Sequence, residues 1–159
     1  MEGGWSSGIS PHLKERIDLG ARLGQVKEAF EAQRQLNMRI DRMKGKRLTD
    51  LSLIPHLYDE YNRIALENGF RGDMRNGNHK QFLMVLFLLY CPEAIFRGQI
   101  RRDFCLAVVR LLGLKSRNSV YNMRDKGASW YALYPQFSAE VDLAYNEIVG
   151  DIDTIKARL

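Results

Sequence analysis

Apolar residues recur at intervals of three and four along the first quarter of the chain. Ser10 can cap free backbone amides, and Pro11 suits the first turn of a helix. At this spacing follow Leu19, Leu23, Val26 and Phe30, after which the stripe shifts to Leu36, Ile40 and Met43. This spacing predicts a long amphipathic helix with a narrow apolar stripe. Such a helix projects as an arm, pairs with a second copy or packs onto its own domain, and the sequence leaves the three alternatives open.

Two more helices are predicted in the middle of the chain. Gly45 interrupts the first helix, and the basic residues Lys44, Lys46 and Arg47 surround that break. A second helix is predicted over residues 52–68, followed by a loop over residues 71–78, which contain two glycines and two asparagines. Residues 82–90 are apolar throughout with one β-branched side chain, which favours a buried helix ended by Pro92.

The last third of the chain predicts three further helices. Residues 102–112 are apolar on nearly all sides and stop at Gly113, and a short helix follows from Ser116 until Gly127 ends it. The aromatic residues 130–134 before Pro135 indicate a packed corner more than a platform for stacked bases. A final stripe consists of Phe137, Val141, Tyr145, Ile148, Ile152 and Ile155. With no convincing strand pair, the predicted class is all-α: a long N-terminal helix followed by a compact orthogonal helical bundle.

Three segments make up the predicted domain organisation. Residues 1–10 form a flexible N-terminus, residues 11–47 the long helix and its basic turn, and residues 48–159 a helical domain. The share of hydrophobic residues is 45% and that of charged residues 27%, as in ordinary globular proteins. The first ten residues lack a signal-peptide pattern, and the longest apolar run, residues 82–91, is too short to cross a bilayer. We therefore expect no membrane partner.

Residues with catalytic or metal-binding potential are scattered. His12, His56 and His79 lack the spacing of metal ligands, and Cys91 and Cys105 both lie within apolar runs. The chain contains neither a complete phosphate-binding loop nor a nucleophile elbow. These patterns predict a reducing compartment, no catalytic residue, no metal, no cofactor and no enzymatic activity.

Positive charge is concentrated in residues 97–126. Eight basic residues there face only two acidic residues, Asp103 and Asp125, although the net charge of the whole chain is only +5. A local excess of this kind attracts polyanions. The alternative interpretation is an ordinary solvated face of a helical core.

Two helices within residues 101–126 offer a mechanism for binding DNA. Val120 and Met123 are expected to face inward, whereas the exposed side chains are expected to be Arg117, Asn118, Tyr121, Asn122 and Arg124. Arginine and asparagine suit bidentate contacts with guanine and adenine. Free amides near Ser116 favour a phosphate. The flanking backbone would be neutralised by Arg97, Arg101, Arg102, Lys115 and Lys126.

The same segment resembles the helix-turn-helix family, whose second helix enters the major groove. The residues that carry the resemblance are Ala107, Gly113, Ser116, Val120 and Tyr121. Gly113 and Val120 are one position further apart than in the usual family pattern, so either the turn is longer here or the match is accidental.

A broader resemblance covers residues 82–148, which look like small proteins of gut bacteria and their tailed phages, including the crAss-like group. It implies a protein of a phage or mobile element that regulates genes, acts in packaging or sits within the virion. The predicted function is therefore non-enzymatic DNA binding in the cytoplasm of a bacterial host. The alternative is a structural or assembly protein, such as a virion connector or internal component, that docks on a partner or on itself through residues 11–44.

Overall fold

The described part of the chain in the computed structural model, residues 11–42, 47–70, 77–95 and 98–159, consists of helices and contains no β-strand. In chain order the elements are α1 (Pro11–Arg42), the 3-10 turn η2 (Leu51–Leu53), α2 (Ile54–Glu67), α3 (Gly77–Tyr90), the 3-10 turn η3 (Pro92–Ala94), α4 (Arg102–Leu112), α5 (Arg117–Leu133) and α6 (Pro135–Ala157). The all-α class is confirmed. The predicted flexible segment 1–10, the basic positions 44 and 46 and most of the predicted loop 71–78 lie outside the described residues.

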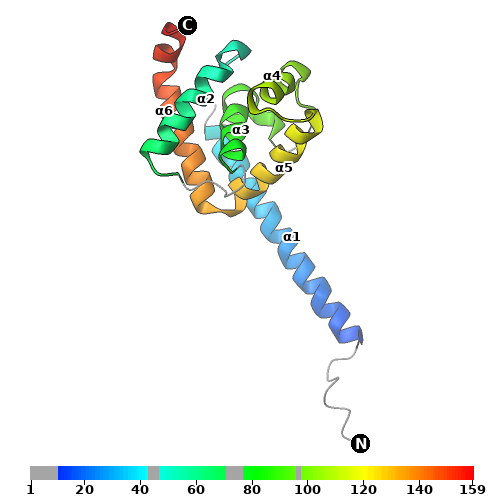
Figure 1. Cartoon of the computed structure of the whole chain (residues 1–159). Helices are drawn as coiled ribbons and strands as arrows, with labels where there is room; N and C mark the ends of the chain where they lie inside the picture. The colour runs from blue at the N-terminus through cyan, green and yellow to red at the C-terminus, as the bar shows by residue number, and fades with distance from the viewer. Residues whose placement is uncertain (1–10, 43–46, 71–76, 96–97) are drawn as a thin grey trace, which may run out of the picture.

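Helix α3 forms the centre of the fold. In Figure 1 it lies between the pair α2 and α6 and the pair α4 and α5. All side chains of residues 82–89 are at most 4% exposed, which explains why this stretch is apolar on every side. The Phe82 ring lies 5.0 Å from that of Tyr58 on α2, and the Phe87 ring lies 5.4 Å from that of Phe104 on α4. Helix α3 therefore joins the two pairs through aromatic contacts.

The predicted final helix is confirmed as α6, with Pro135 in its first turn and Gly150 inside it. Its predicted apolar stripe faces the core, with Val141 and Ile148 completely buried and Ile152 half-buried.

A buried polar side chain, Gln81, links helices α2, α3 and α6. Gln81 of α3 accepts a hydrogen bond from the Tyr61 hydroxyl of α2 at 2.7 Å and donates one to Glu140 of α6 at 2.7 Å. The polar atoms of Gln81 are thus satisfied inside the core.

The prediction that Gly127 ends a short helix is wrong. Helix α5 continues through Gly127 to Leu133, so the aromatic corner predicted at residues 130–134 is mostly the end of this helix. A Cβ on Gly127 would lie 2.9 Å from Sδ of Met84 on α3. Glycine stands there because the two helices approach closely, and its low helix propensity is outweighed by this packing.

Helix α1 contacts the bundle through its C-terminal half and projects away from it with its N-terminal half (Figure 1). Leu36 is only 2% exposed against the bundle, whereas Leu23, Val26 and Phe30 are 56%, 48% and 67% exposed.

No helix in the described ranges is long and apolar enough to cross a membrane.

Candidate nucleic-acid interface

Helices α4 and α5 are joined by a four-residue turn. Phe104, Cys105 and Val108 anchor α4 in the core, and Gly113 ends it with a positive φ of 64°, a conformation that glycine adopts without strain. Ser116 then takes an extended conformation at the start of α5, without a capping hydrogen bond from its side chain. Val120, completely buried, anchors the first turn of α5. The predicted ends of α4 are confirmed, and the turn brings a second helix onto the same core.

The starts of α4 and α5 border one groove of about 520 Å³. Its lining consists of Gln99, Ile100, Arg101, Arg102, Arg117, Asn118 and Tyr121. We call this the arginine groove, because three of the residues that line it are arginines: Arg101, Arg102 and Arg117. All three arginines are exposed to solvent.

Two polar contacts involve residues that line the arginine groove. The backbone N–H of Ile100 donates a hydrogen bond to the Tyr121 hydroxyl at 2.9 Å, which fixes the segment before α4 against the first turns of α5. Arg101 lies 2.7 Å from Asp103, and both of these side chains are exposed to solvent. Arg102 and Arg117 have no such ion pair within the described residues.

The predicted outward position of Arg124 is wrong. Its side chain is 7% exposed, and Nη1 donates hydrogen bonds to the backbone oxygens of Ala94 at 3.2 Å and Gly98 at 2.9 Å. Its Nε also donates to Asp125 at 3.2 Å. Since these bonds satisfy the guanidinium inside the protein, Arg124 fastens the segment before α4 to α5 and cannot contact a base edge.

The remaining predicted residues fall into three groups. Tyr121 lines the arginine groove but is half-buried, so its ring is only partly accessible. Lys115, Ser116, Asn122 and Lys126 are exposed but do not line the groove. Arg97 lies outside the described residues.

A spacing in the sequence indicates the burial of Arg124. Val120 and Arg124 are four residues apart and therefore lie on the same side of a helix. Gly127, Ala128 and Tyr131 continue this buried side along α5. The pattern is incomplete if the helix is assumed to end at Gly127, because Ala128 and Tyr131 then lie outside the helix.

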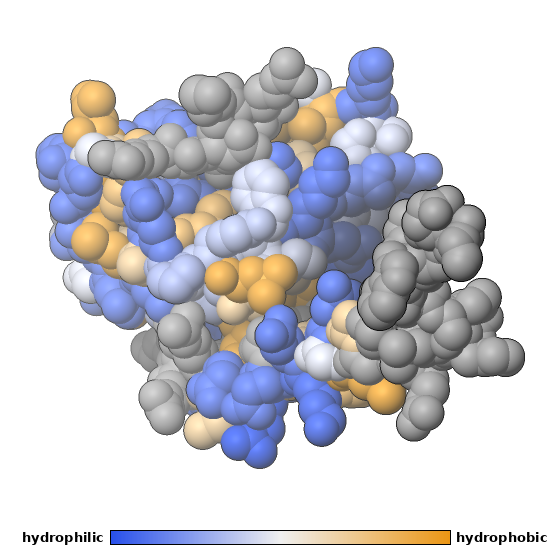
Figure 2. All heavy atoms as spheres, turned by 90° about the horizontal axis from the view of Figure 1, so that it is seen from below, coloured by the Kyte–Doolittle hydropathy of each residue, from blue (hydrophilic) through white to orange (hydrophobic). Residues whose placement is uncertain are grey.

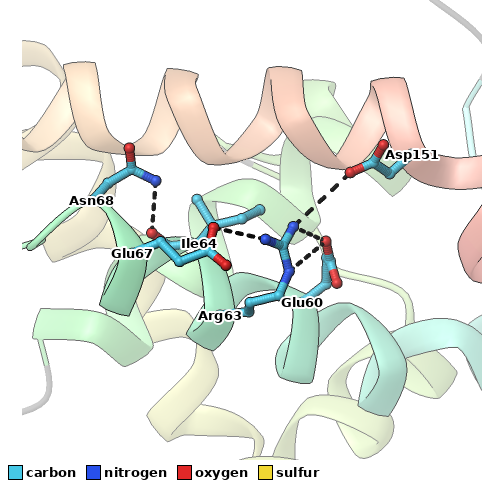
Figure 3. A network of polar contacts seen from close by, with 6 residues as sticks. All are labelled: Glu60, Arg63, Ile64, Glu67, Asn68 and Asp151. Carbon is cyan, nitrogen blue, oxygen red and sulfur yellow. Dashed lines mark hydrogen bonds and ion pairs between the residues drawn. The ribbon is translucent and has the colours of Figure 1, made fainter.

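A second polar cluster connects α2 with α6 (Figure 3). Arg63 of α2 donates hydrogen bonds to Glu60 and to Glu67, the latter at 2.8 Å, and lies 4.0 Å from Asp151 of α6. Glu60 is 8% exposed. Hydrogen bonds from Arg63 hold the pKa of the Glu60 carboxyl below its ordinary value. The cluster therefore consists of one cation, Arg63, with carboxylates from both α2 and α6 around it.

Groups suited to nucleophilic or metal chemistry are not assembled in the described ranges. Burial raises the pKa of the Cys91 thiol to about 12 and also raises the pKa of Cys105, which keeps both thiols protonated and poorly nucleophilic. Burial lowers the pKa of His79, whose Nε2 lies 3.4 Å from the Tyr58 hydroxyl. Among the described residues, no three histidine, cysteine, aspartate or glutamate side chains gather as metal ligands would.

Comparison of this chain with protein-family models, with curated proteins and with solved structures found no match.

Proposed function

We propose that this chain is a non-enzymatic DNA-binding protein that holds the DNA backbone in its arginine groove. The observation that carries the proposal is the convergence of Arg101, Arg102 and Arg117 on a single groove at the starts of two consecutive helices.

The chemistry of the groove suits a phosphate. A guanidinium group offers a planar fork of donors that matches two phosphate oxygens, and it stays charged at any physiological pH. Free backbone N–H groups at the start of a helix also favour a nearby anion. Arg117 opens α5, whose first turn contains no acidic residue, so a guanidinium group and a helix start act together there. Arg102 opens α4, where Asp103 accepts a hydrogen bond from the backbone N–H of Phe104, so at that helix the attraction comes from the guanidinium group.

Contacts with bases are assigned to the exposed start of α5. Asn118 and Asn122 are four residues apart, are both exposed and share one side of the helix. Asparagine pairs in a bidentate manner with adenine, and Arg117 next to them can reach guanine. Because Arg124 is buried, fewer side chains can contact bases than the sequence predicted. We therefore expect binding in which the backbone contributes most of the affinity and the bases a smaller share.

The proposed biological setting follows from the resemblance to proteins of gut bacteria and their tailed phages. A protein of this kind would act in the cytoplasm of a bacterial host, as a regulator of phage or mobile-element genes or as a packaging factor. The basic groove is compatible with either role, because both require contact with the DNA backbone.

The test is binding of the purified protein to a labelled random duplex, followed by fluorescence anisotropy at about 50 and 200 mM salt. We expect affinity to fall steeply with salt because each phosphate contact releases counterions. Arg102→Ala and Arg117→Ala should each weaken binding and reduce the slope of log affinity against log salt by about 1. The same titration with single-stranded DNA determines which form is preferred.

Arg110→Ala is the matched control. Arg110 is an exposed arginine near the end of α4 that does not line the arginine groove, so its loss removes the same charge from the same pair of helices. If Arg110→Ala weakens binding as much as Arg117→Ala does, the attraction is general and the groove is not the site. Absence of binding at the lower salt concentration would refute the proposal.

A second function, in the assembly of a larger protein complex, is favoured by the exposed apolar side chains on the projecting part of α1. A structural component that docks through this helix, such as a virion connector or internal component, would cover them. Deletion of residues 1–30, which keeps the buried Leu36, should then abolish capture of the partner while leaving DNA binding by the arginine groove in place.

A further inference from the structure

An apolar surface extends from residues 23–30 of α1 onto α5. Its exposed members on α1 are Leu23, Val26 and Phe30. Beside them a groove of about 320 Å³ is lined by Ala29, Gln33, Ile95, Asp125, Ala128, Ser129, Ala132 and Leu133. We call these residues together the α1–α5 surface. Figure 2, viewed from the side toward which α1 projects, shows hydrophobic residues at the surface among hydrophilic ones.

This surface contains both a protruding group and a recess. Phe30 is 67% exposed, although full burial of an aromatic side chain is worth about 1.5–3 kcal/mol. Half of the residues on the walls of the neighbouring groove are small, with Ala29 from α1 and Ala128, Ser129 and Ala132 from α5. Small side chains leave room for a large one from another molecule.

Helix geometry places Phe30 on the apolar flank of α1. Gln33, which lines the groove, is three residues from Phe30 and seven from Val26, so all three lie toward one side of the helix. A different groove, on the opposite flank, is lined by Glu28, Glu31 and Gln35. The exposed apolar side chains therefore border the groove that contains Ala128 and Ala132, and they lie away from the groove that contains Glu28 and Glu31.

Charges of opposite sign accompany the two parts of the surface. Lys27 and Arg34 lie three residues before and four residues after Phe30, so they flank it on α1. Arg34 also lies 3.7 Å from Glu31. The groove carries Asp125, whose side chain remains 64% exposed next to Arg124. A molecule that inserted an aromatic side chain with basic neighbours would therefore meet one exposed carboxylate, which also accepts a hydrogen bond from Arg124.

The best match to this recess is the protrusion on the same surface. An interface with two-fold symmetry requires one patch that is complementary to itself, because each contact of one copy is repeated by the other. We propose that the α1–α5 surface binds the same surface of a second copy, with Phe30 of each copy in the groove of its partner. Lys27 and Arg34 then lie close to the partner's Asp125. This inference does not depend on the proposed DNA binding.

The test is the molar mass of the full chain, measured without DNA by sedimentation equilibrium over a range of concentrations. We expect the mass to rise from 18.4 kDa toward twice that value. Phe30→Asp should raise the dissociation constant of the dimer by about 30-fold or more, as expected for a central aromatic anchor. Leu66→Asp is the matched control, because Leu66 on α2 is 85% exposed and lies outside the α1–α5 surface. Circular dichroism checks that both variants remain folded.

A monomeric mass at every concentration up to about 1 mM would overturn the proposal and leave the surface for a different partner. So would a dimer that survives Phe30→Asp, or one that both substitutions weaken equally.

A charge exchange gives an independent measurement. Lys27→Glu and Asp125→Lys should each weaken the dimer, because each places like charges across the interface. The variant with both substitutions reverses the two signs and should recover most of the lost affinity. A double variant that binds no more tightly than the single variants would overturn the pairing of these two parts of the surface.

Discussion

Gly127 of α5 and Met84 of α3 lie so close that a Cβ on the glycine would be 2.9 Å from the Met84 sulfur and 3.2 Å from its Cγ. Met84 is 1% exposed, so its side chain has little room to move aside. The contact explains why a glycine stands inside α5, and it packs that helix closely against α3. Packing against α3 thereby positions the face that we assign to DNA.

Substitution of Gly127 should therefore show the cost of this contact. Gly127→Ala improves helix propensity by about 1 kcal/mol but forces Met84 to shift, at a cost of about 1–3 kcal/mol for added atoms in a packed core. Gly150→Ala is the control, because Gly150 is inside α6 and a Cβ there meets nothing within 4 Å. Urea denaturation should show Gly150→Ala to be the more stable variant by about 1–3 kcal/mol. Equal stabilities would contradict the close approach.

Arg124 is predicted to support the fold without contacting DNA. Arg124→Ala removes the donors to the backbone oxygens of Ala94 and Gly98, and loss of a hydrogen bond from a charged group costs about 1.5–3 kcal/mol. The free energy of unfolding should fall by about that amount. Arg117→Ala should leave it nearly unchanged, because Arg117 is exposed.

Affinity for DNA should distinguish Arg117→Ala from Arg124→Ala in the opposite sense to stability. Under conditions where both are folded, Arg117→Ala should bind DNA more weakly, whereas Arg124→Ala should bind as the unchanged protein does. A folded Arg124→Ala protein with greatly reduced affinity would assign Arg124 to the interface after all.

The cluster around Arg63 predicts a dependence of stability on pH. Because the pKa of Glu60 is lowered in the folded state, its ionised form stabilises the fold at pH values above the ordinary carboxyl pKa of about 4.3. This contribution is lost as the pH falls through the lowered pKa, when the carboxylate binds a proton. Glu60→Gln should therefore be less stable than the unchanged protein at neutral pH, and the difference should shrink in acid.

Glu67→Gln provides the comparison for that measurement. Glu67 pairs with the same arginine but is 57% exposed, and exposed ion pairs contribute little. We expect its free energy of unfolding, measured in urea from pH 7 downward, to follow that of the unchanged protein closely. A Glu60→Gln deficit that stays constant into acid would show that the carboxylate charge is not responsible.

Local patterns were sufficient for much of the helical part of the chain. The bounds of α4 follow from an apolar run ended by Gly113, whose left-handed conformation is a property of glycine itself. Burial of α3 follows from apolar side chains on every side, since a helix of that kind has no face suited to water. Val120 faces inward as its spacing on the helix predicts, and the all-α class follows from the repeated spacing of three and four.

What the sequence alone determined is therefore the class of the fold, the central helix and the concentration of positive charge near α4 and α5. The tertiary structure decided which of those charges reach solvent, because the spacing that places Arg124 on the side of Val120 does not reveal what covers that side of the helix. Arg124 and Arg117 have the same side chain on the same helix, yet one is buried by backbone oxygens of a segment about thirty residues earlier and the other lines a groove. The physical reason is that burial depends on contacts between distant parts of the chain, whereas spacing reports only on neighbours along one helix.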